Sequence, residues 1–68
     1  MQFPSREFKS QLALHGIKQT DVAKQIGSSR YIVCGVINNT MQSEWVWDRL
    51  MSIYHAMAAK KFTRLEDY

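Results

Sequence analysis

The chain has 68 residues, which makes residues 1–68 one domain, since a chain this short buries too little apolar surface for two cores. Hydrophobic residues make up 46% of it and charged residues 22%, a composition that excludes the disordered and collagen-like classes. The formal net charge is +3, and the whole excess lies in residues 1–40. A basic half joined to a neutral half indicates one surface for a polyanion and another for packing or pairing.

The first predicted helix covers residues 5–15. Phe8 and Leu12 are four residues apart on one face, and Ser5 is of a type that caps helix N-termini. Gly16 suits the left-handed residue that follows a helix. A second predicted helix lies in residues 19–26 and ends before another glycine.

Residues 30–37 are rich in β-branched and aromatic side chains, whose propensity favours a strand. Their spacing favours a helix instead, because Val33, Val36 and Ile37 recur at i, i+3 and i+4. Two serines precede the segment, and either Ser28 or Ser29 supplies an N-cap. We therefore predict a third helix here.

A longer fourth helix is predicted after Ser43, because a broad apolar stripe follows this capping residue. Before it, Asn38 and Asn39 tolerate a left-handed turn. The side chains of the stripe are expected to be core: Trp47, Leu50, Met51 and Tyr54, with Val46, Ile53 and Met57 beside them. In the tail, Phe62, Leu65 and Tyr68 recur every third residue, which fits a last helical turn or a docking tail.

Residues 19–38 read Gln-x-x-Val-Ala-x-x-Ile-Gly-x-x-x-x-x-Val-x-x-Val-x-Asn. The small Ala23 lets two helices cross closely, and Gly27 supports a tight bend between them. With these residues, the chain resembles the helix-turn-helix family of phage Cro proteins and repressors, the xenobiotic-response-element family, over roughly residues 8–57. The resemblance implies an all-α, compact four- to five-helix domain of lambda-repressor-like type, with residues 19–38 as the helix-turn-helix core.

The resemblance also implies that the third helix lies in the DNA major groove. The family positions that reach bases correspond to Ser29, Arg30, Tyr31 and Gly35. Arg30 is the strongest candidate, because its planar fork can donate to both O6 and N7 of a guanine. Tyr31 suits a base, a phosphate or a thymine methyl, and equally an ordinary surface position.

By the same resemblance, Gln19 and Asn38 contact backbone phosphate. Position and charge add Ser28, Lys18 and Lys24 as further phosphate contacts.

The chain departs from the family pattern at two positions. Lys18 stands where the family has a capping Ser or Thr, so the second helix is expected to begin as late as Thr20. Gly35 offers no side chain to the bases, so recognition of the DNA sequence is expected to depend on Arg30 and Tyr31 or on DNA shape.

These features predict a sequence-specific, double-stranded DNA-binding transcriptional regulator, a Cro-like repressor of phage or mobile-element type. It is expected to bind a pseudo-palindromic operator as a homodimer and to act by occupancy. Residues 43–68 are assigned to dimerisation, with Phe62, Leu65 and Tyr68 at the interface.

Other compartments and chemistries are not expected. The lone Cys34 cannot form an internal disulfide, which indicates a reducing, cytoplasmic setting and support from a second copy. The apolar run at residues 31–37 is far shorter than the roughly 20 residues that cross a bilayer, and no secretory signal is recognised, so no membrane partner is expected. Cys34, His15 and His55 lack the spacing of a zinc site or a nucleophile, so no enzyme activity, metal, cofactor or small-molecule ligand is expected.

A protein-interaction module, such as an antirepressor or inhibitor on the same scaffold, is the alternative. Gly35 and the apolar Ile32 in the third helix favour it. The salt dependence of DNA affinity distinguishes the two functions.

Overall fold

A computed structural model describes residues 2–68 of the chain. It contains four α-helices and a short 3₁₀ turn: α1 (Ser5–Leu14), α2 (Gln19–Ile26), α3 (Arg30–Ile37), α4 (Glu44–Ala58) and η1 (Leu65–Asp67). No strand occurs in residues 2–68, so the predicted all-α class is confirmed and the strand propensity of residues 30–37 is overridden. The Cα radius of gyration is 10.7 Å, about the value of a compact chain of this length.

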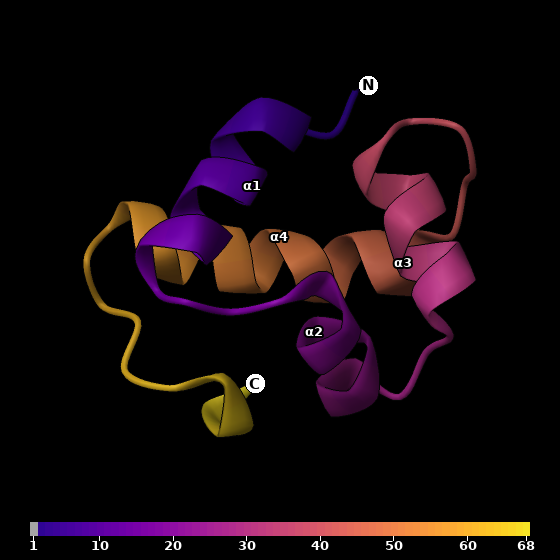
Figure 1. Ribbon diagram of the computed structural model, residues 1–68. Coiled ribbons are helices and arrows are strands. Elements are labelled where there is room, and N and C mark those ends of the chain that lie inside the picture. Colours follow the sequence, from indigo (N-terminus) through magenta and orange to yellow (C-terminus); the bar gives the residue numbers. More distant parts are fainter. Residues whose placement is uncertain (1) are drawn as a thin grey trace.

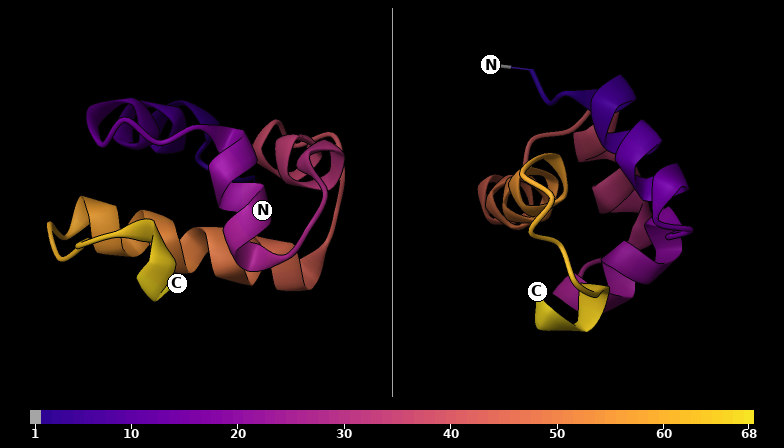
Figure 2. Two further views of the ribbon diagram at one scale, coloured as in Figure 1. Left: turned by 60° about the horizontal axis from the view of Figure 1, so that its bottom comes forward. Right: turned by 90° about the vertical axis from the view of Figure 1, so that its left-hand side faces the viewer.

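The longest helix, α4, runs behind the other three (Figure 1). Helix α3 lies near its N-terminal end, and α1 and α2 lie in front of it. After α4 the tail turns back, and η1 packs beside α2, as the two views of Figure 2 also show. No helix within residues 2–68 has the length and apolarity needed to cross a membrane.

The core collects apolar side chains from all four helices and from the N-terminal segment. Its buried members are Phe3, Phe8, Leu12, Val22, Ala23, Val33, Val36, Ile37, Val46, Leu50, Ile53 and Met57. The predicted stripe of α4 is therefore rotated, because three of the four residues placed at its centre are only partly buried: Trp47, Met51 and Tyr54. The amphipathic rings of Trp47 and Tyr54 suit the border between core and solvent, since a fully buried Tyr hydroxyl or Trp N–H needs a hydrogen-bond partner.

The four helices end in one common arrangement. One residue at each C-terminus has a positive φ: the C-cap itself in α2, and the residue after the C-cap in the other three helices. The next N–H bonds to the carbonyl five residues earlier, at 2.9–3.0 Å. The positive-φ residues are Gly16 (66°), Gly27 (77°), Asn39 (62°) and Lys60 (58°). The two glycines confirm the sequence prediction, and of the two asparagines only Asn39 is left-handed.

The helix starts are less uniform. Ser29 caps α3 as predicted, its Oγ accepting the N–H of Ile32 at 3.2 Å. Ser5, in contrast, lies inside α1, because the carbonyl of Pro4 already accepts the N–H of Phe8 at 2.9 Å. The prediction that Ser5 caps this helix is wrong.

Helix α2 begins at Gln19, with Lys18 as its N-cap residue, and not at Thr20. The N–H of Lys18 donates to Asp21 Oδ2 at 3.3 Å, so an acidic residue in the first turn supports this start. At the start of α4, Ser43 holds the N-cap position but makes no side-chain capping bond.

Candidate nucleic-acid interface

Helices α2 and α3 pack directly against each other, joined by residues 27–29. Val22 and Ala23 on α2 and Val33 and Val36 on α3 are buried, as their spacing predicted. Core packing therefore fixes which face of α3 points outward.

The first turn of α3 presents a cation and an aromatic ring to solvent. Arg30 is exposed and Tyr31 is 76% exposed. Within the described residues, no ion pair holds the Arg30 guanidinium. The exposed Ser29 accepts the N–H of Ile32 and keeps its hydroxyl hydrogen free to donate. Arg30 and Tyr31, the two side chains predicted to read bases most directly, are thus accessible to a partner.

Beside this turn, a hollow lies between α1, the start of α2 and Arg30. We call it the basic hollow; its lining residues are Lys9, Leu12, Ala13, Ile17, Lys18, Gln19, Thr20 and Arg30. It holds three cationic side chains, and no carboxylate is among its lining residues. A lining with several cations and no carboxylate attracts anions.

Lys9 is the member of this hollow that the sequence analysis missed. Its Nζ donates to Asn38 Oδ1 at 2.8 Å, so α1 and the end of α3 meet at two polar residues. The only signal for Lys9 in the sequence is its share of the basic excess in residues 1–40, because it lies outside the 19–38 pattern.

Gln19 is held in place by the neighbouring helix. The Cys34 thiol on α3 donates to Gln19 Oε1 at 2.9 Å. This contact leaves the two hydrogens of Nε2 free to donate, next to the positive end of the α2 dipole. Such an amide, presented at a helix N-terminus, suits a phosphate oxygen.

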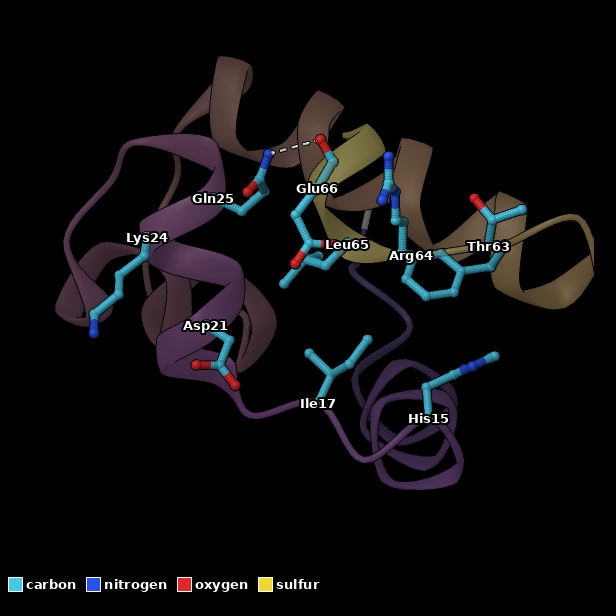
Figure 3. Close-up of a pocket in the computed structure, with 10 residues that line it drawn as sticks. His15, Ile17, Asp21, Lys24, Gln25, Thr63, Arg64, Leu65 and Glu66 are labelled. Atoms are coloured by element: carbon cyan, nitrogen blue, oxygen red, sulfur yellow. Dashed lines mark hydrogen bonds between the residues drawn. The ribbon is translucent and has the colours of Figure 1, made fainter.

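Two predicted phosphate contacts lie elsewhere. Lys24 lines a different hollow, between α2 and the tail, together with Asp21 and Glu66 (Figure 3). Within residues 2–68, the Ser28 hydroxyl oxygen is buried without a hydrogen-bond partner, and its N–H bonds to the Ala23 carbonyl. Its position argues against a phosphate contact through this hydroxyl.

The predicted base contact at Gly35 also differs from the structure. Gly35 is buried, and Met41 from the loop after α3 lies over it. A Cβ at position 35 would be 2.8 Å from the Met41 Cβ, which explains the glycine at this position. Met41, and not residue 35, occupies this part of the α3 surface.

The predicted dimer contacts pack within their own chain. The ring of Phe62 stacks on Tyr68 at 5.5 Å and lies 4.9 Å from the His15 ring. Leu65 is part of η1 against α2, so the tail is a docking tail and not an extension of α4. All three apolar side chains are partly buried and keep some exposed surface, and their role between two copies remains a prediction.

The cysteine and the two histidines have different neighbours in hydrogen bonds and ring contacts. Cys34 contacts Gln19, and the His55 ring lies 5.8 Å from that of Tyr54. Within residues 2–68, no three His, Cys, Asp or Glu side chains converge as a metal site requires.

Comparisons with family models, curated proteins and solved structures found no match to this chain. The surface of α2 and α3 is therefore the basis for a functional proposal.

Proposed function

We propose that this chain is a sequence-specific, double-stranded DNA-binding transcriptional regulator, a Cro-like repressor with a lambda-repressor-like helix-turn-helix. One observation carries the proposal: the exposed Arg30 lines a hollow with two further cations and no carboxylate, and the exposed Tyr31 follows it in the first turn of α3. DNA offers the matching surface, since its major groove admits an α-helix between two rows of phosphates.

The proposed complex places the first turn of α3 against base edges. Arg30 donates to O6 and N7 of a guanine, and Ser29 and Tyr31 contact adjoining groups. Around the turn, four side chains contact the backbone phosphates: Lys9, Lys18, Gln19 and Asn38. These contacts come from α1, the start of α2 and the end of α3, so they orient α3 in the groove.

The regulator is proposed to act in the cytoplasm as a homodimer. Two α3 helices related by a twofold axis would enter major-groove segments about 34 Å apart on a pseudo-palindromic operator. The half-exposed tail residues Phe62, Leu65 and Tyr68 are the proposed contacts between the copies. Bound protein would then exclude polymerase from an overlapping promoter.

Selection of bound sequences from a random DNA pool, followed by affinity measurements across salt concentrations, tests this function. We expect one enriched motif and an affinity that falls steeply as salt rises, because phosphate contacts release counterions. A chain that binds no DNA at low salt would instead support the protein-interaction module.

Gln19→Ala isolates the phosphate contribution. We expect it to weaken binding to the selected and to random DNA alike by about 1 kcal/mol, the value of one hydrogen bond. Gln25→Ala is the matched control, because this second glutamine of α2 donates to the Glu66 carbonyl on the tail side at 3.3 Å. A change of sequence preference in Gln19→Ala would contradict its assignment to phosphate.

A further inference from the structure

The α3 surface carries an apolar side chain that does not come from α3. Met41 lies across position 35, with its Sδ 3.5 Å and its Cε 3.6 Å from where a Gly35 Cβ would be. A residue with a side chain at position 35 would therefore displace Met41. The glycine allows a side chain from the following loop to reach the helix surface.

Hydrogen bonds hold this loop against the end of α3. The carbonyl of Gly35 accepts the N–H of Thr40 at 2.9 Å and that of Met41 at 3.2 Å. The Asn39 amide binds both backbone groups of Phe3, accepting its N–H through Oδ1 at 2.6 Å and donating to its carbonyl at 3.1 Å. Since Phe3 is buried in the core, the loop has a fixed position and Met41 is a defined part of the surface.

Met41 shares one shallow hollow with the side chains proposed to read DNA. Arg30, Tyr31 and Asn38 line the same hollow, and no carboxylate is among its lining residues. The Tyr31 ring and the Met41 thioether line it together with Cys34 and Thr40, and Gly35 adds no side chain. The hollow thus combines the apolar surface of Tyr31 and Met41 with the Arg30 side chain.

One group in the major groove suits such a hollow. Thymine alone presents a methyl group there, at C5, and apolar side chains recognise it by contact. A methionine thioether is well suited, because it is flexible and polarizable. We propose that Met41, together with Tyr31, contacts the C5-methyl group of a thymine near the guanine that Arg30 reads, and so determines specificity at a second base. This inference rests on the proposed DNA-binding function.

Replacement of thymine by deoxyuridine tests the contact, since it removes only the methyl group. The selected DNA site is synthesised with each thymine replaced in turn, and the affinity of the full chain is measured for each duplex. At one position, we expect uracil to weaken binding about fourfold, the effect of one buried methyl group. At that position, Met41→Ala and the similarly long Met41→Gln should discriminate clearly less between the thymine and uracil duplexes than the wild type does.

Two further variants separate this contact from general damage. Leu14→Gln changes an apolar side chain that is 78% exposed outside this hollow, and it should keep the wild-type methyl effect. Gly35→Ala places a Cβ against Met41 and should reduce the methyl effect while the preference for guanine persists. Circular dichroism verifies that each variant is folded.

The outcomes show separately whether the Met41 contact and the proposed DNA-binding function hold. If Arg30→Ala abolishes guanine preference but no uracil substitution changes wild-type affinity, the proposed function stands and the Met41 contact is wrong. A methyl effect that persists unchanged in folded Met41→Ala also overturns the contact. Absence of DNA binding at low salt overturns both.

Discussion

Two hollows lie along α2, and they differ in how their charges are compensated. The basic hollow contains three cations and no carboxylate among its lining residues. The hollow on the tail side is lined by both signs of charge, Lys24 and Arg64 with Asp21 and Glu66, and the Gln25 amide donates to the tail backbone (Figure 3). A surface where carboxylates stand beside the cations attracts an anion less than a surface lined by cations without carboxylates. We therefore propose that the side of α2 at the basic hollow binds an anionic partner. The side that faces the tail packs within the chain.

Removal of the tail is the largest expected perturbation, and its direct effect on the fold is on the tail side of α2. Truncation after Lys61 deletes the partly buried Phe62, Leu65 and Tyr68, which pack against the core cluster. We expect the free energy of unfolding to fall by about 3 kcal/mol, roughly 1 kcal/mol for each partly buried side chain. Urea denaturation measures this change.

The same truncation tests the dimer. If these side chains also join two copies, sedimentation of the truncated chain should shift toward monomer. Unchanged stability would show that the tail adds little to the fold, and an unchanged dimer would remove it from the interface.

A substitution at the basic hollow should weaken DNA binding and leave the stability of the fold unchanged. Arg30→Ala is expected to cost about 1–3 kcal/mol on the selected site and to flatten discrimination at one base pair, because a bidentate contact to guanine is lost. Arg64→Ala is the matched control, since this arginine is 72% exposed in the tail and pairs with Asp67 at 3.3 Å. Titrations of selected and random duplexes measure both effects. An equal loss on random DNA would contradict base reading by Arg30.

Features determined by neighbours in sequence were predictable. The helix period of residues 30–37 outweighed their strand propensity, and the Ser29 cap and the turns at Gly16 and Gly27 followed from local chemistry. Each depends on a few consecutive residues, so the sequence contains most of the necessary information.

Features determined by contacts between distant segments were not predictable. Lys9 meets Asn38 only because α1 and α3 fold together, 29 residues apart. Met41 belongs to a loop, which has no periodicity to indicate where its side chain lies. The rotation of the α4 stripe likewise depends on which neighbours cover Trp47, whose ring lies 5.3 Å from that of Phe3.

The smallest expected effect is the pH dependence of the tail contacts. The Thr63 hydroxyl donates to Asp67 Oδ2 at 2.6 Å and Arg64 to Oδ1 at 3.3 Å, and these bonds, the first above all, hold the pKa of Asp67 below its ordinary value. The folded chain therefore binds this proton less tightly than the unfolded chain. The stabilisation is present above the ordinary carboxylate pKa and is lost as the pH falls through the lowered value.

The free energy of unfolding, compared between the wild-type chain and Asp67→Asn across pH, measures this stabilisation. The wild type should be slightly more stable near neutrality, and the difference should disappear as the pH falls through the lowered pKa of Asp67 and the carboxylate is protonated. Because Asp67 is 45% exposed, water screens the interaction and the difference should be small. DNA affinity at neutral pH should be equal in the two proteins, since the tail side of α2 is assigned no phosphate. A stability difference that grows on acidification would contradict the assigned bonds, and a loss of DNA affinity in Asp67→Asn would contradict the division between the two sides of α2.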